Sequence, residues 1–158
     1  MTLVGPELKA GEKAPEFEAI DNTLKPVTLA STGDGIRIFS VVPSLDTPVC
    51  DMQTKRFNEE AAKLSDVDIY TISMDLPFAQ KRFCTDAGIT TMTTLSDVHN
   101  GSFGKNWGVL IEGLPLPLLA RAVFVVDKSG KVTYAEYVSE VTSEPNYEAA
   151  LNALKSAA

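Results

Sequence analysis

The sequence predicts an α/β domain in which helices flank a mixed central sheet. Short runs rich in β-branched and aromatic residues alternate with helical patterns through the first half of the chain, and an antiparallel hairpin and a last helix follow. The chain has 158 residues, of which 44% are hydrophobic, so it is long enough to bury one core. We therefore expect residues 1–158 to form a single domain.

Four runs predict strands, because each is short, rich in β-branched or aromatic residues and bounded by turn-forming residues. The first three are almost continuously apolar, as expected of strands that are covered on both faces. Between the last two, Lys128, Ser129 and Gly130 predict a tight turn and hence an antiparallel hairpin. The predicted strands span residues 36–42, 67–73, 122–127 and 131–138.

Helical patterns fill most of the remaining chain. The first has apolar positions that include Met52 and Phe57. In the second, Asp75 is placed to cap the N-terminus and Pro77 to open the first turn. Phe78, Phe83 and Ala87 around Cys84 suggest that this helix has a partly buried face. The predicted helices span residues 48–64, 77–87, 100–107 and 146–156.

Charge and hydropathy exclude several classes of partner. The formal net charge is −7 and the sequence pI is about 4.7, so the phosphate backbone of a nucleic acid is repelled on average. The first residues lack the pattern of a secretory leader, and no window approaches the roughly 18 apolar residues of a membrane span. We therefore expect a cytoplasmic protein with reduced thiols and with neither nucleic-acid nor membrane partners.

The position of Cys50 indicates a reactive thiol. Thr47 is the expected N-cap and Pro48 the first residue of a helix, which places Cys50 in the first turn near free backbone N–H groups. Such a position lowers a cysteine pKa and produces a thiolate. Two alternatives remain open: Cys50 is a small buried hydrophobic residue, or it forms a structural disulfide with Cys84, which the expected cytoplasmic setting disfavours.

Elimination narrows the chemistry further. His99 is the only histidine, so a Cys-His hydrolase would need it to reach Cys50, and an exposed loop histidine is the simpler interpretation. Two cysteines and one histidine are too few for the usual structural zinc site. Because the chain contains no CxxC, GxSxG, Walker A or HExxH motif, thiol redox chemistry between widely spaced cysteines remains.

Residues 43–50, PSLDTPVC, resemble the P-x-x-x-T-x-x-C motif of the peroxiredoxins, and VVPSLDTPVCD resembles its form in the thiol peroxidase subgroup. DLPFAQKRFC, LLARAVFVVD and TSEPNYEAAL, at residues 75–84, 118–127 and 142–151, are similar to further segments of that subgroup. The resemblance implies a thioredoxin-like fold. The family usually begins with a longer N-terminal hairpin, so we expect the first strand to be short or absent.

The resemblance also implies a role for each site residue. Cys50 would be the peroxidatic cysteine, which attacks a hydroperoxide and becomes a sulfenic acid. Cys84 would be the resolving cysteine, which condenses with that sulfenic acid to form an intramolecular disulfide. Arg121 would hold the thiolate and polarise the peroxide, although a surface arginine that opens a strand is its plainer interpretation. Thr47 would hydrogen-bond the peroxide, and Pro43 would shield the pocket.

The resemblance implies hydrogen peroxide or an alkyl hydroperoxide as substrate, thioredoxin as reductant, a homodimer, and no cofactor, metal, haem or flavin. Leu45, Val49 and the loop at residues 113–119 suggest an apolar pocket that favours alkyl hydroperoxides, although the loop can equally serve a subunit contact. Because the cysteines lie on different predicted helices, we expect one or both helices to unwind when the disulfide forms.

Two other functions compete with this interpretation. The same disulfide can serve as a conformational switch in a peroxide-sensing or interaction protein that is not an enzyme. A thiol-disulfide oxidoreductase that acts on proteins is less well supported, because the chain lacks a CxxC motif.

Overall fold

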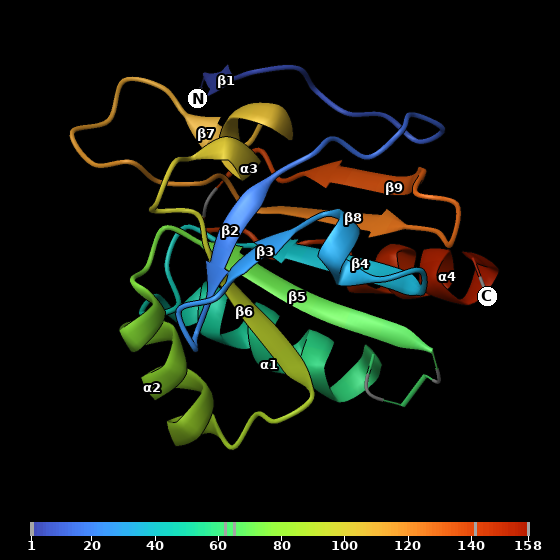
Figure 1. Ribbon diagram of the computed structural model, residues 1–158, viewed down its shortest axis with the longest axis horizontal. Helices are drawn as coiled ribbons and strands as arrows, with labels where there is room; N and C mark the ends of the chain where they lie inside the picture. Colours follow the sequence, from blue (N-terminus) through green and yellow to red (C-terminus); the bar gives the residue numbers. More distant parts are fainter. Residues whose placement is uncertain (1, 62, 65, 141, 158) are drawn as a thin grey trace.

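The computed structural model describes residues 2–61, 63–64, 66–140 and 142–157. Within these ranges, seven strands form one mixed sheet in the order β3-β2-β6-β5-β4-β8-β9, and β1 pairs with β7 in a separate ribbon (Figure 1). Strands β4, β5 and β6 are parallel, and the other pairs are antiparallel. The strands are β1 (Leu3–Val4), β2 (Glu18–Asp21), β3 (Pro26–Thr28), β4 (Ile36–Val41), β5 (Val67–Ser73), β6 (Met92–Ser96), β7 (Leu110–Ile111), β8 (Ala122–Val126) and β9 (Val132–Tyr137).

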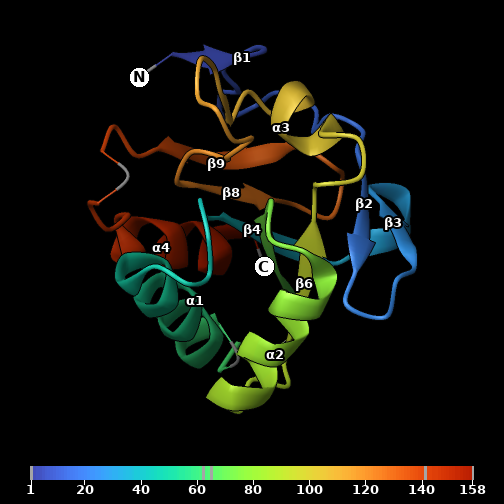
Figure 2. The same ribbon diagram turned by 90° about the vertical axis from the view of Figure 1, so that its left-hand side faces the viewer.

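The longer helices cover one face of the sheet. Helix α1 packs on β4 and β5, α2 on β6, and α4 on β4, β8 and β9, whereas α3 and the β1–β7 ribbon lie on the opposite side (Figure 2). Because β4 leads into α1 and β5 into α2, both helices begin at the carboxyl edge of the parallel strands. The helices are η1 (Ala30–Thr32), α1 (Pro48–Ala61), α2 (Pro77–Ala87), α3 (Ser102–Asn106) and α4 (Tyr147–Ala157).

Strand β4 separates two hydrophobic cores because its side chains alternate between the faces of the sheet. Ile36 and Ile38 pack with Phe57 of α1 in the core under the helices. Phe39 packs with Trp107 on the opposite face. None of the helices in the described part of the chain has the length and apolarity of a membrane span.

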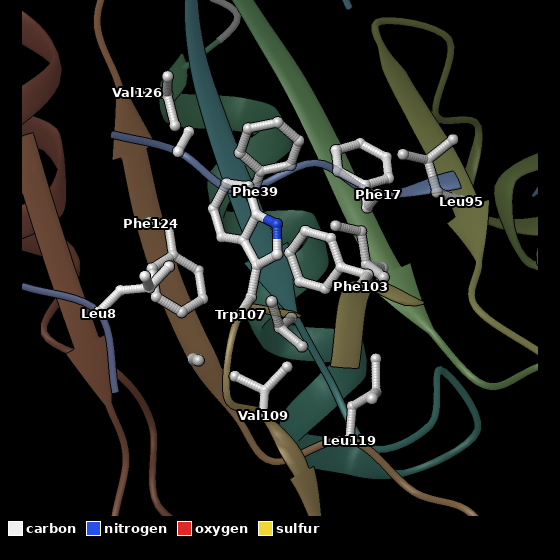
Figure 3. Close-up of a cluster of buried hydrophobic side chains, with 14 of the residues drawn as sticks. Leu8, Phe17, Phe39, Leu95, Phe103, Trp107, Val109, Leu119, Phe124 and Val126 are labelled. Atoms are coloured by element: carbon white, nitrogen blue, oxygen red, sulfur yellow. The ribbon is translucent and has the colours of Figure 1, made fainter. Parts of the chain in front are cut away.

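An aromatic cluster fills the core that faces away from α1 (Figure 3). Trp107 stacks on Phe103 with ring centroids 4.6 Å apart, and Phe39 and Phe124 lie 5.1 and 5.2 Å from it. The Trp107 indole N–H donates to the carbonyl of Pro15 at 3.1 Å, so its one polar group is satisfied. This cluster stabilises the sheet from the side opposite to both cysteine-bearing helices.

The predicted alternation of helices and strands is confirmed, and so is the β8–β9 hairpin. The ranges predicted for β5 and α2 coincide with those in the structure. Helix α1 is described to Ala61, and residues 63 and 64 are no longer helical, so the predicted end at residue 64 is wrong. Strands β2, β3, β6 and β7 were not predicted, and β1 is short rather than absent.

Candidate active site

Cys50 lies in the first turn of α1 and is fully buried, with 0% of its surface exposed. The chain leaves β4 at Val41 and passes the buried Pro43 before the helix starts. Thr47 stands immediately before the helix, and its carbonyl accepts the first helical hydrogen bond, from the Asp51 N–H at 2.9 Å. The strand-to-helix connection therefore fixes Cys50 at the positive end of the helix dipole.

Arg121 contacts the Cys50 sulfur directly. It precedes β8 and is only 1% exposed, so the interpretation as a surface residue is wrong. Its Nη2 donates to Cys50 Sγ at 3.1 Å, and its Nη1 donates to Gln53 Oε1 at 2.9 Å. The planar guanidinium thus uses two donors to join the sulfur to a second side chain of the same helix.

Gln53 holds the arginine in place and was not predicted. Its Nε2 donates to Ser40 Oγ at 2.7 Å and to the Val41 carbonyl at 3.5 Å, so its amide oxygen faces Arg121. The side chain is fully buried. Its spacing was an available signal, because residue i+3 of a helix shares a face with residue i and Gln53 lies three residues after Cys50.

This arrangement suits chemistry on an anionic sulfur and on an oxygen that gains negative charge. A guanidinium and the start of a helix both favour negative charge nearby, and their donors are fixed before any reaction begins. The hydrogen-bonded series Ser40, Gln53, Arg121 and Cys50 connects β4, α1 and the segment before β8. The position of the donors therefore depends on the central sheet rather than on a surface loop.

A small pocket of about 160 Å³ opens beside this cluster. Three predicted site residues, Pro43, Thr47 and Arg121, meet in its wall, and the Thr47 hydroxyl donates to the carbonyl of Ser44 at 3.0 Å. The loop at residues 113–119 does not line it. The full lining is Pro43, Thr47, Pro48, Val49, Arg121 and Thr142, and most of the surface that they expose to the pocket is apolar.

Cys84 lies apart from this pocket. It is 7% exposed and packs in the core under the helices, whereas Cys50 packs with Val42 and Leu45. Phe83 contacts both clusters, and both thiols are free. Burial raises the pKa of the Cys84 thiol, and the Thr94 hydroxyl lowers it by less. Because both cysteines are free thiols, the structure is that of the dithiol form.

Two expectations about α2 are wrong. Phe78 was expected on the buried face with Cys84 but is 67% exposed. Leu76, not Asp75, precedes the helix, and no side chain caps its N-terminus. The Asp75 carboxylate points instead to the loop before α1, where it accepts hydrogen bonds from Ser44 Oγ and the Leu45 N–H, each at 2.8 Å.

His99 lies outside this cluster. It is exposed in the turn after β6, and its Nε2 is 3.9 Å from a carboxylate oxygen of Glu18. The interpretation as an exposed loop histidine is confirmed, and a Cys-His pair with Cys50 is not formed. Among the residues that the structure describes, no group of three or more His, Cys, Asp or Glu side chains is arranged to hold a metal ion.

Known proteins are similar to this chain over nearly its whole length. The Redoxin family model matches residues 9–151. Thiol peroxidases from Halalkalibacterium halodurans and Bacillus subtilis are each 56% identical, over 99% and 98% of this chain and 93% and 92% of their own. A solved peroxiredoxin-like protein from Aquifex aeolicus has a TM-score of 0.92 at 47% identity, covering 99% of this chain and 92% of that one.

A thiol peroxidase from Chromobacterium violaceum is more distant. Its structure has a TM-score of 0.89 at 19% identity and covers 98% of this chain and 90% of its own. At that level of identity the similarity concerns the fold alone. The same arrangement of strands and helices thus persists where four residues in five differ.

Proposed function

Because the chain belongs to the Redoxin family, as a thiol peroxidase with the thioredoxin-like peroxiredoxin fold, we propose that Cys50 is its peroxidatic cysteine and Cys84 its resolving cysteine. The observation that carries the proposal is the 3.1 Å hydrogen bond from Arg121 to the Cys50 sulfur. It pairs the sulfur with a permanent cation in a buried site beside a small pocket.

In the first step, the Cys50 thiolate attacks the terminal oxygen of a hydroperoxide. The O–O bond breaks, Cys50 becomes a sulfenic acid, and the leaving oxygen takes a proton and departs as water or an alcohol. Arg121 stabilises the negative charge that develops on that oxygen, and the Thr47 hydroxyl orients the peroxide. Pro43 closes the apolar side of the pocket, where it excludes water from the thiolate.

In the second step, the Cys84 thiol attacks the sulfenic sulfur, and a disulfide and one water molecule form. A disulfide requires Cα atoms within about 7 Å, whereas the two thiols occupy separate buried clusters with Phe83 packed against both. We therefore expect the first turn of α1, part of α2 or both to unwind between the dithiol and the disulfide forms.

The remaining assignments concern partners. Thioredoxin would reduce the disulfide and restore both thiols. The apolar pocket lining favours alkyl hydroperoxides alongside hydrogen peroxide. Leu114 and Leu116 are 46% and 65% exposed in the loop that lies outside the pocket, which supports the second interpretation of that loop, as a contact between the subunits of a homodimer.

Three proteins test the cysteine roles. Cys50→Ser should lose peroxide reduction. Cys84→Ser should consume one equivalent of peroxide and then stop or over-oxidise. The wild type should turn over continuously with a thioredoxin system, because each cycle regenerates both thiols. Undiminished turnover by Cys84→Ser would remove the proposed resolving role, and full activity of Cys50→Ser would remove the peroxidatic one.

A further inference from the structure

Asp75 joins the two segments that carry the cysteine helices. Its Oδ1 accepts a hydrogen bond from the Ser44 hydroxyl, and its Oδ2 accepts from the Leu45 N–H and the Ser73 hydroxyl, each at 2.8 Å. The residue is half-buried in the segment between β5 and α2. The loops that precede α1 and α2 lie side by side at this point (Figure 2).

Ser44 and Leu45, the two residues of the α1 loop that bond to Asp75, both shape the surroundings of Cys50. The carbonyl of Ser44 accepts hydrogen bonds from the Thr47 N–H at 3.3 Å and from the Thr47 hydroxyl at 3.0 Å, which shapes the turn immediately before the helix. The Leu45 side chain is 4% exposed and packs in the cluster of Cys50. The carboxylate therefore positions the approach to the sulfur by hydrogen bonding and by packing.

Helix α2 is also fixed at its other end, one turn after Cys84. Gly88 adopts φ +68°, a left-handed conformation, and its N–H donates to the Thr85 carbonyl at 3.2 Å. The N–H of Ile89 donates to the Cys84 carbonyl at 2.9 Å, which completes a Schellman motif. Since the helix is held at both ends, movement of the Cys84 thiol toward Cys50 requires one of these attachments to open.

We propose that Asp75 is a positioning residue that holds the dithiol form of the enzyme and releases the α1 loop when the disulfide forms. The proposal rests on the function proposed above, in which Cys50 and Cys84 form that disulfide. Because the three hydrogen bonds to the carboxylate belong to the dithiol form, their removal should destabilise that form relative to the disulfide.

The redox midpoint potential of the cysteine pair tests this directly. The protein is equilibrated with glutathione, and each intramolecular disulfide formed converts one oxidised glutathione into two thiols. Asp75→Ala should shift the equilibrium about tenfold toward the disulfide, which is a potential about 30 mV more negative. Asp75→Asn and Ser44→Ala should shift it in the same direction by less, because each retains part of the network.

Asp127→Asn is the matched control. Like Asp75, Asp127 accepts three hydrogen bonds. They come from the N–H groups of Ser129 and Lys131 and from the Ser129 hydroxyl, but Asp127 lies in the β8–β9 turn. Its substitution should destabilise both redox forms alike and leave the potential unchanged. If Asp75→Ala does not fold, the two milder variants carry the same test.

The outcomes separate this proposal from the one on which it rests. A wild-type potential in Asp75→Asn and Ser44→Ala would overturn the role of Asp75 while leaving the disulfide intact. An equal shift in Asp127→Asn would overturn it too, since the effect would be general. If mass spectrometry finds no intramolecular disulfide in the wild type, both proposals fail.

Discussion

The Arg121 guanidinium donates one hydrogen bond to the Cys50 sulfur at 3.1 Å and another to the Gln53 amide oxygen at 2.9 Å. A single planar group thus ties the sulfur to the helix that carries it, and Gln53 in turn bonds to Ser40 of β4. In the proposed mechanism, these donors, which the fold holds in place, stabilise the oxygen that leaves when the peroxide bond breaks.

Arg121→Lys should slow peroxide attack by about 10²- to 10³-fold, because one ammonium cannot reproduce both hydrogen bonds in their planar arrangement. Single-turnover kinetics of Cys50 oxidation measure this step alone. Arg37→Lys is a suitable control, since Arg37 is also buried but bonds to Thr32 and backbone carbonyls instead. It should lower stability and leave the attack rate intact; equal slowing in both variants would argue against a specific role for Arg121.

Gln53→Leu should reduce the attack rate about tenfold and the free energy of unfolding by about 1–3 kcal/mol, because it removes the acceptor of the Arg121 Nη1 hydrogen bond and the donor to the buried Ser40 hydroxyl oxygen. Stopped-flow oxidation and urea unfolding measure the two effects. Gln80→Leu removes another buried glutamine. Gln80 lies on α2 and donates hydrogen bonds to the Ser73 hydroxyl oxygen and to the Leu95 carbonyl of β6. That variant should lose stability only, and a normal attack rate in Gln53→Leu would disprove the positioning of Arg121 by Gln53.

Helix α2 shows how far the sequence allowed the fold and the site to be predicted. Pro77 begins the helix and Gly88 ends it, so its bounds could be predicted from these two residues. Strand β6 was missed because its buried residues include the hydroxyl side chains Thr94 and Ser96, which do not form an apolar run. Strand β3 was missed because it is only three residues long and begins with Pro26.

The site could be predicted where a motif existed and not where tertiary position decides. Thr47 and Arg121 were placed by resemblance, and the structure brings both to one pocket. Gln53 belongs to no motif, and its partner is 68 residues away in the sequence. Asp75 lies just before α2, where its carboxylate can either cap the helix or accept hydrogen bonds from a neighbouring loop. Only the position of Ser44 beside it in the folded protein selects the loop contact.

The buried thiol of Cys84 predicts a pH dependence of stability. Its pKa in the folded protein is raised by burial above the value of about 8.5 expected in the unfolded chain. The unfolded thiol therefore ionises first as the pH rises. Stability from Cys84 is complete below about pH 8.5 and is lost as the pH rises through the folded pKa.

This loss can be isolated by urea unfolding of reduced Cys50→Ser with and without Cys84→Ala. The difference in unfolding free energy between these two proteins should change in favour of the alanine variant between about pH 8 and pH 10. Parallel pH profiles would show that Cys84 has no raised pKa. Since Cys50 is absent from both proteins, its titration does not contribute.

Trp107 should contribute to the free energy of unfolding but not to the rate of Cys50 oxidation. Trp107→Ala should cost about 3–5 kcal/mol of unfolding free energy, because it empties the centre of the aromatic cluster on the face of the sheet away from α1. Trp107→Phe keeps most of that volume and should cost less. Both variants, assayed below their melting temperature, should oxidise Cys50 at the wild-type rate; a slower step would mean that the two cores are coupled through the sheet.

The most direct test of the central claim is mass spectrometry of the reduced protein after one equivalent of cumene hydroperoxide. The account predicts a loss of two hydrogens and a peptide pair that links Cys50 to Cys84, together with one equivalent of alcohol. An unreacted Cys50 would contradict its peroxidatic role. A Cys50 that remains a sulfenic acid, with Cys84 still a free thiol, would contradict the intramolecular disulfide.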